Sequence, residues 1–395
     1  MTLADAMRRA ESLHPSVRAK EAQLIAAEGS RREASSLFFQ NPAVSVERTR
    51  RTVDQPDGRA NEWSAGLSQA IETGGQQGRR REAAGAGLMA LGAEIDEARR
   101  QARSDAAARF HAVLAAQRRV LVEQRSLELF ESTAQAVAKR LSAGEDTRLD
   151  SNVAVIEAER ARNALALARE LLLDARSELA TAVQLPPDAL PQITGELVPP
   201  GDVLPYNLSE LLTATQMQPR QRALAAREEA ARAKVGVERA RRYPDVTVGL
   251  NVGREGPGVA RERLTTISVS VPLPLFNRND AAIGQAQSEA TQAEIDRTTA
   301  VRDSQAQVRR LWSRLDSQRQ RLQRLRSAML SAAADNRQLA AKSRQAGQIG
   351  LLDQLLVNRQ SLDAERELND ALAEFHSARI ELEHATGWSQ ESSPK

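Results

Sequence analysis

The feature that most constrains the fold of this chain is an internal repeat with a spacing of about 203 residues. The ungapped matches include Lys139 with Lys342, Gly144 with Gly347, and Asp150 with Asp353. Both halves also carry heptads of alternating large and small apolar residues, a pattern typical of a closely packed coiled-coil seam. In one register, Leu165, Leu172 and Leu179 correspond to Leu368, Phe375 and Leu382. The pattern predicts a duplicated, mainly helical protein.

Four long stretches contain no proline, and their apolar residues recur with helical periodicity. They cover residues of about 77–141, 149–183, 280–344 and 351–386. At ~1.5 Å per residue the longest would span on the order of 95 Å, which suits a tube or a coiled-coil rod better than a compact domain. Aromatic residues make up only 3% of the chain, which is too few for an ordinary globular core.

The repeats divide the chain into segments with a common order of elements. We expect a first repeat over 1–185, a proline-rich linker over 186–206, a second repeat over 207–388 and a tail over 389–395. Prolines in the linker exclude a continuous helix between the repeats. In each repeat, shorter helices precede two strands, and two long helices follow. The predicted strands cover about 42–50, 62–72, 244–253 and 263–275.

The predicted strands alternate between apolar residues and small or polar residues, which indicates two different faces. Their length suits tilted strands of a membrane β-barrel, and an apolar outer face with a polar inner face is the pattern of a barrel wall. The residues that we expect to face lipid in the second repeat are Val246, Val248, Leu250, Val252, Ile267, Val269 and Val271.

Aromatic residues cluster beside the same segments, as an interfacial girdle requires. They are Phe38, Phe39, Trp63, Tyr243 and Phe276. The segments 54–58 and 256–258 are rich in turn residues and are expected to close the hairpins. Four strands cannot close a barrel, because about eight is the minimum, and lipid tolerates no open sheet edge. The chain must therefore contribute its strands to an oligomeric barrel, which three copies would build from twelve strands.

Residues that the chain lacks exclude several kinds of site. The absence of cysteine excludes disulfides, thiolate nucleophiles and Cys-ligated metals. No stretch approaches the ~20 apolar residues of a membrane-spanning helix. A metal site needs about three or four convergent ligands, whereas the four histidines are scattered. They are His14, His111, His376 and His384.

Two glycine- and arginine-rich motifs have ordinary structural interpretations. Gly74-Gly75 lacks the lysine and the Ser/Thr of a phosphate loop, so a turn before the next helix is favoured. The run Arg79-Arg80-Arg81 suits a solvated face or a lipid-phosphate contact better than nucleic acid, and we expect no nucleic-acid partner. No catalytic arrangement stands out, so the alternative to a channel is a soluble coiled-coil scaffold.

With these features together, the chain resembles the TolC-like outer-membrane efflux channels of Gram-negative bacteria. The resemblance covers nearly the whole chain and rests on the duplicated helix–strand–strand–helix order. Its motifs are Val271-Pro272-Leu273-Pro274-Leu275-Phe276-Asn277-Arg278 after the fourth strand, and Ala346-Gly347 followed by Leu352-Asp353. Ile71-Glu72-Thr73-Gly74-Gly75 with Gly78-Arg79 is similar to the heavy-metal cation branch of cobalt-zinc-cadmium type.

The resemblance implies a homotrimer whose twelve-stranded outer-membrane β-barrel continues into a periplasmic α-barrel. It implies a passive exit duct with no enzyme activity, no cofactor and no bound metal. The implied partners are outer-membrane lipid, a periplasmic adaptor protein and an inner-membrane pump of the resistance-nodulation-division type. Selectivity for the substrate is expected in the pump and the adaptor.

The resemblance also assigns roles to individual residues. Gly144 and Gly347, with Asp150, would lie at hairpin tips that dock the adaptor. Asp353 matches an acidic residue that lines the closed periplasmic entrance, and Leu356 stands where a second acid usually follows, which implies a partly apolar gate. Family members are exported to the outer membrane and periplasm. Because this chain begins without an apolar signal-peptide core, we expect that its export signal has been removed or truncated.

Overall fold

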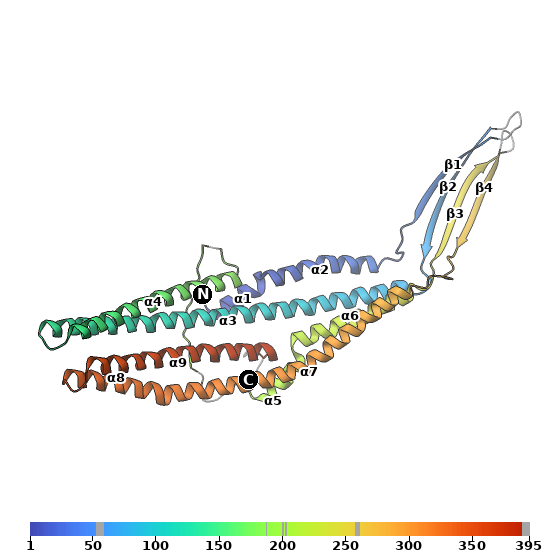
Figure 1. The fold of residues 1–395 in the computed structure, drawn as a ribbon. Coiled ribbons are helices and arrows are strands. Elements are labelled where there is room, and N and C mark those ends of the chain that lie inside the picture. The colour runs from blue at the N-terminus through green and yellow to red at the C-terminus, as the bar shows by residue number, and fades with distance from the viewer. Residues whose placement is uncertain (53–58, 187, 200, 202–203, 257–260, 389–395) are drawn as a thin grey trace. The chain divides into compact units, whose positions relative to one another are not determined.

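The computed structural model describes residues 1–52, 59–186, 188–199, 201, 204–256 and 261–388. The protein is mainly helical with one small antiparallel sheet (Figure 1), which confirms the predicted fold class. The turn predicted at 54–58, most of the turn predicted at 256–258, and the tail at 389–395 lie outside the described residues.

The order of helices and strands repeats once along the chain. The first set is α1 (Leu3–Leu13), α2 (Pro15–Ala34), β1 (Ala43–Thr52), β2 (Arg59–Ile71), α3 (Gln76–Ser142) and α4 (Arg148–Ala182). The second set is α5 (Leu208–Met217), α6 (Pro219–Ala240), β3 (Val246–Glu255), β4 (Glu262–Ser270), α7 (Asp280–Arg324), η1 (Leu325–Met329), α8 (Leu330–Gln345) and α9 (Leu351–Thr386).

The chain forms two compact units, and each unit draws on both repeats. The first unit comprises Met1–Ala19, Ile95–Pro219 and Val301–Lys395. The second unit comprises Lys20–Glu94 and Arg220–Ala300, and it contains the sheet. The units therefore cut across the boundaries of the sequence repeats, because helices such as α3 contribute residues to both.

One π-helical turn, η1, interrupts the second long helical stretch, where the sequence predicts a continuous helix. Leu322, before this turn, and Leu325, its first residue, are buried. After it, Met329 is exposed, and its neighbour Leu330 packs against the core. A π turn holds one extra residue, so the apolar seam moves forward by one position.

The apolar cores of the first unit are narrow seams between helices. One core joins α7, η1 and α9 with α5, around Leu315, Phe375 and Leu382. A second joins α1, α3 and α4 around Phe110 and Leu179. The linker residues Ile193 and Leu197 are buried in this second core, so this part of the linker packs against the helices. A third core lies where α3, α4 and α9 approach their tips.

The sheet has the strand order β1-β2-β3-β4, and every neighbouring pair is antiparallel. Figure 1 shows the strands side by side in this order. The central pair, β2 and β3, comes from different repeats, with Leu67 opposite Leu250. The duplication therefore produces one continuous sheet from two hairpins.

Candidate functional site

One face of the sheet is apolar along most of its length. Residues directly opposite one another in neighbouring strands share a face, so rows can be followed across the sheet. One row is Val44, Leu67, Leu250 and Ile267, and the next is Val46, Ala65, Val252 and Thr265. Val44 is 74% exposed and Ile267 is 75% exposed in the single chain. A contiguous exposed apolar surface of this kind marks contact with a membrane or another protein.

The seven residues that the sequence assigns to lipid contact follow this face. Val246, Val248, Leu250 and Val252 alternate along β3, and Ile267 and Val269 lie opposite them on β4. Val271 follows directly after the last residue of β4. Strict alternation placed them correctly on one face because the side-chain period of a strand is two.

The opposite face of the sheet carries small and polar side chains. One of its rows is Ser45, Gly66, Asn251 and Thr266, and another is Ala43, Ser68, Gly249 and Ser268. A Cβ atom at Gly249 would lie 2.6 Å from Ser268 Oγ, so no larger residue fits there without rearrangement. Such a face suits contact with water in a channel lumen.

Both outer strands of the sheet have one unpaired edge. β1 pairs only with β2, and β4 pairs only with β3, among the residues that the structure describes. Each edge presents backbone N–H and C=O groups without partners in the sheet. In a bilayer these groups must be paired with another strand.

The aromatic residues predicted as a girdle do not lie at one end of the strands. Phe38 and Phe39 precede β1, Tyr243 precedes β3 and Phe276 follows β4, so these four flank the strand ends that lead to helices. Trp63 lies in β2, towards the hairpin end. All five residues lie close to the strands in sequence. Trp63, however, lies towards the hairpin end of β2, whereas the other four lie at the opposite end of the strands.

The Gly74-Gly75 motif forms a clasp between the end of β2 and the start of β3. A Cβ atom at Gly74 would lie 2.6 Å from Tyr243 Cβ, so the side chain of Tyr243 requires a glycine here. Gln76 Nε2 donates hydrogen bonds to the backbone oxygen of Tyr243 at 3.0 Å and to Asp245 Oδ1 at 3.2 Å. The motif is therefore a structural junction and not a phosphate-binding loop.

Two residues of the arginine run beside this clasp are paired within the chain. Arg79 forms an exposed ion pair with Glu82 at 2.9 Å. Arg80 forms a largely buried ion pair with Glu72, and its guanidinium carbon lies 4.4 Å from the centre of the Phe39 ring. Arg80 therefore stabilises the junction between strands and helices.

The predicted hairpin tips have similar backbone geometry. Gly144 and Gly347 have φ angles of +79° and +71°, a left-handed conformation that favours glycine. Asp150 accepts hydrogen bonds from the backbone N–H and the hydroxyl of Thr147, and together they form a capping box at the start of α4. These hydrogen bonds lower the pKa of Asp150.

Asp353 occupies the equivalent position at the second tip. Its Oδ2 accepts a hydrogen bond from the backbone N–H of Gly350 at 3.1 Å, which caps the start of α9. Asp353 is exposed, and Leu356, one turn further along, is 56% exposed. Both residues are thus accessible in the single chain, and Asp353 has a structural role in addition to its charge.

A buried carboxylate that the sequence interpretation missed connects the two tips. The side chain of Asp146 is only 4% exposed and lies between two arginines. It accepts from Arg140 Nε at 3.2 Å and from Arg344 Nη2 at 2.7 Å. Arg140 belongs to the first tip and Arg344 to the second, so this contact holds the two hairpins together.

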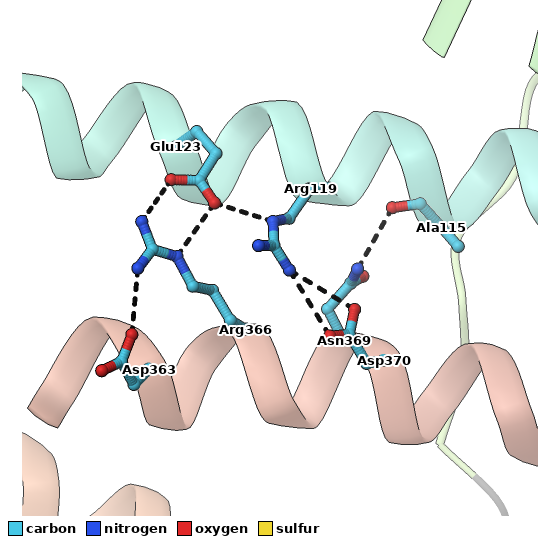
Figure 2. A network of polar contacts seen from close by, with 7 residues as sticks. All are labelled: Ala115, Arg119, Glu123, Asp363, Arg366, Asn369 and Asp370. Carbon is cyan, nitrogen blue, oxygen red and sulfur yellow. Dashed lines mark hydrogen bonds and ion pairs between the residues drawn. The ribbon is translucent and has the colours of Figure 1, made fainter. Parts of the chain in front are cut away.

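Further along the helices, Glu123 forms the centre of a network between α3 and α9 (Figure 2). It is 1% exposed and accepts from Arg119 Nε at 2.7 Å and from Arg366 Nε at 2.9 Å. Figure 2 also shows Asp363 bonded to Arg366 and Asp370 bonded to Arg119. These contacts neutralise a carboxylate that would otherwise be strongly disfavoured inside the helical packing.

A second buried carboxylate, Glu157, connects α4 with α9 in a similar way. It is 5% exposed, pairs with Arg160 of its own helix at 2.9 Å, and accepts from Arg359 Nε at 2.9 Å. Glu123 and Glu157 both lie in the first repeat, whereas Arg359 and Arg366 lie in the second. Sequence reasoning missed both, because the partners are about 200 residues or more apart in the chain.

Two of the four histidines meet inside the first unit. The rings of His111 and His376 stack with centroids 4.9 Å apart. His376 Nε2 lies 2.9 Å from the backbone oxygen of Val198 in the linker. Burial, assisted by the nearby His111, lowers the pKa of His376 to about 4. Burial also lowers the pKa of His111.

Among the described residues, no three or more His, Cys, Asp or Glu side chains are placed together to hold a metal ion. Over the same residues, no helix combines the length and the apolar character needed to cross a bilayer.

Comparison with known proteins identifies relatives with this architecture. Residues 212–388 match the family described as outer membrane efflux protein. Over 325 residues the chain is 28% identical to the cobalt-zinc-cadmium resistance protein CzcC of Cupriavidus metallidurans, covering 82% of this chain and 77% of that protein. The crystal structure of CusC aligns with a TM-score of 0.79 at 16% identity, over 97% of this chain and 91% of that chain. VceC of Vibrio cholerae aligns with a TM-score of 0.78 at 20% identity, over 98% and 96%.

Proposed function

We propose that the chain, whose residues 212–388 match the outer membrane efflux protein family, is the passive outer-membrane duct of a tripartite system that exports heavy-metal cations. An inner-membrane pump of the resistance-nodulation-division type would deliver the cations through a periplasmic adaptor. The chain would supply the conduit and the docking surface, without catalysis.

The observation that carries this proposal is the pair of contrasting faces on a sheet with two open edges. The apolar rows are exposed in the single chain, and the opposite rows consist of small polar residues. Four strands are too few for a barrel, and open edges are not tolerated in lipid. Three copies would pair β4 of each chain with β1 of the next and enclose a polar lumen.

The choice of heavy-metal cations rests on the relationship to CzcC, whose name refers to cobalt, zinc and cadmium resistance. A duct must bind its substrate weakly, or the ions would not leave. We therefore assign selectivity to the pump and the adaptor, and we expect resistance to persist when all four histidines are replaced by glutamine.

The entrance role of Asp353 requires a test that separates its charge from its capping bond. Asp353→Asn keeps an oxygen that can accept from the N–H of Gly350 but removes the negative charge. If three copies of Asp353 line the entrance, this variant loses cation selectivity in planar bilayers, because the carboxylates concentrate cations. Asp150→Asn, at the equivalent capping position of the first tip, is the matched control. Equal selectivity in all three proteins would contradict the entrance role.

The channel itself is tested by placing an arginine on either face of one strand. Val269→Arg should impair insertion, because a cation on the lipid face costs about 2–4 kcal/mol near the middle of the bilayer. Ser268→Arg, the neighbouring residue on the opposite face, should insert and reduce conductance. Outer-membrane fractions and single-channel recordings measure the two effects. Equal behaviour of the variants, or a water-soluble wild-type monomer, would favour a coiled-coil scaffold instead.

A further inference from the structure

A row of arginines crosses the apolar face of the sheet towards its hairpin end. Arg48 lies opposite Trp63, Trp63 lies opposite Arg254, and Arg254 lies opposite Arg263, so the row includes all four strands. Arg50 lies on the same face, two residues further along β1. All four arginines are exposed. The face thus changes from apolar to cationic within one row.

Most charges at this end of the sheet are separated by sign between the two faces, with the exception of Arg51, which lies on the small polar face and pairs with Glu62. Each arginine of the row has a glutamate as its neighbour in sequence: Glu47 precedes Arg48, Glu255 follows Arg254 and Glu262 precedes Arg263. Because successive side chains of a strand point to opposite faces, the glutamates lie on the small polar face. The pleat therefore directs the three arginines of the row towards the apolar side and their glutamate neighbours towards the lumen side.

The arginine row has no acidic partner within the part of the chain that the structure describes. Among the described residues, no ion pair involves Arg48, Arg50, Arg254 or Arg263, whereas the neighbouring Arg51 pairs with Glu62 at 3.3 Å. Arg254 and Arg263 lie directly opposite each other, and like charges in that position are destabilising. An anion bound between these guanidinium groups would offset the repulsion.

The position of the row relative to the apolar rows indicates where this anion lies. The row is two residues beyond Val46, Ala65 and Val252, which is about 7 Å along a strand. It lies on the side of the hairpins, away from the strand ends that lead to helices. In the proposed orientation, with the helices in the periplasm, this is the headgroup level of the outer leaflet. Trp63 within the row is typical of such an interface.

We infer that this arginine row binds the phosphate groups of lipid A, the membrane anchor of lipopolysaccharide in the outer leaflet. The guanidinium group binds phosphate in a bidentate manner, and three arginines in one row match a headgroup with more than one phosphate. The inference rests on the proposed function, because it requires the apolar face to lie in the outer membrane. It adds a specific lipid ligand and a physical reason for the sign of the charges on each face.

The test compares lipid A binding by two triple variants of the full chain, purified in detergent. Arg48→Gln/Arg254→Gln/Arg263→Gln removes the row. Arg148→Gln/Arg169→Gln/Arg326→Gln removes three exposed helical arginines and changes the net charge equally. With roughly fivefold in affinity for each arginine near an anionic surface, the first variant should bind purified lipid A on the order of 100-fold more weakly. The control should bind like the wild type, and 0.5 M salt should weaken the binding.

Two further measurements make the result decisive. Replacing the same three arginines of the row by lysine keeps the charge but loses the bidentate guanidinium group, so lipid A should bind this variant more weakly than the wild type and more tightly than the glutamine variant. Vesicles of phosphatidylglycerol should compete weakly, and competition equal to that of lipid A would overturn the assignment of the ligand. Equal lipid A affinity of the first variant and the control would overturn the inference. If lipid A binding is unchanged but the proteins still form conducting trimers, the inference fails and the proposed channel stands. If the wild type itself forms no trimers, the proposed channel is refuted.

Discussion

Replacing Glu123 by glutamine tests whether the buried network between α3 and α9 stabilises the helical unit. Glutamine has nearly the same shape, but it loses the charge that holds Arg119 and Arg366. These two contacts lie at 2.7 and 2.9 Å. The hydrogen bond to Glu123 also raises the pKa of Arg366. The change therefore leaves two guanidinium groups facing a neutral amide.

The expected loss of stability follows from the exposure of the partners. Breaking a buried ion pair on one side costs about 3–5 kcal/mol. Here the side chains of Arg119 and Arg366 are 33% and 28% exposed, so water restores part of the solvation. Arg366 also keeps its bond to Asp363 at 2.9 Å. We therefore expect a decrease of about 2–3 kcal/mol in the free energy of unfolding.

Chemical denaturation of the purified protein, followed by circular dichroism, measures this decrease. Glu128→Gln, at an exposed position of the same helix, is the matched control and should change stability by less than about 0.5 kcal/mol. In a double-mutant cycle with Arg366→Gln, the coupling energy should be about 1–3 kcal/mol. The reasoning is refuted if Glu123→Gln is as stable as the control, or if the coupling energy is zero.

Three further predictions concern the stability of residues in the first unit. Burial keeps His376 neutral with a pKa of about 4 in the folded protein, below its ordinary value of 6.5. The free energy of unfolding should therefore keep its full value above pH 6.5 and decrease by at most about 3 kcal/mol as the pH falls towards 4. His376→Asn should reduce this decrease in denaturation curves measured between pH 7 and 4. Gly350 has a φ angle of −76°, which any residue can adopt, so Gly350→Thr should complete the capping box with Asp353 and raise stability by about 0.5–1 kcal/mol; a decrease in thermal stability would contradict this. Gly347→Val should destabilise its left-handed turn by at least about 1–2 kcal/mol and impair adaptor binding in pull-down assays, whereas Gly347→Asn should be tolerated; equal effects would show that the conformation of this turn is unimportant.

Local periodicity explains why much of the architecture could be predicted from the sequence. Alternation in β3 and β4 assigns Val248 and Val269 to one face without knowledge of the pairing, because the strand period is fixed at two. Heptads assign the helical seams for the same reason. The heptads do not predict the π turn. Met329 and Leu330 are both apolar, so the sequence does not show which of them packs into the core after the inserted residue.

Long-range pairing explains most of what the sequence did not reveal. His111 and His376 lie far apart in the chain, and nothing in their spacing indicates that their rings stack. The same holds for Glu123 and Arg366, each of which resembles an ordinary solvated charge on a helix. The alternation of glutamate and arginine along β3 and β4 was visible in the sequence, but its meaning depends on the register that aligns Arg254 with Arg263.

The ion pairs between the repeats also bear on how a duplicated chain can evolve. At the repeat spacing of about 203 residues, Glu123 corresponds to Arg326, and Arg366 corresponds to Asn163. The two halves are therefore related in fold but complementary in charge, so neither could replace the other. A ring of three chains alternates two kinds of hairpin and has threefold symmetry, whereas six identical halves would have sixfold symmetry. Once each half depended on the charges of the other, a return to a single-repeat hexamer would have left Glu123 and Glu157 with only the arginines of their own helices, Arg119 and Arg160, and without Arg366 and Arg359.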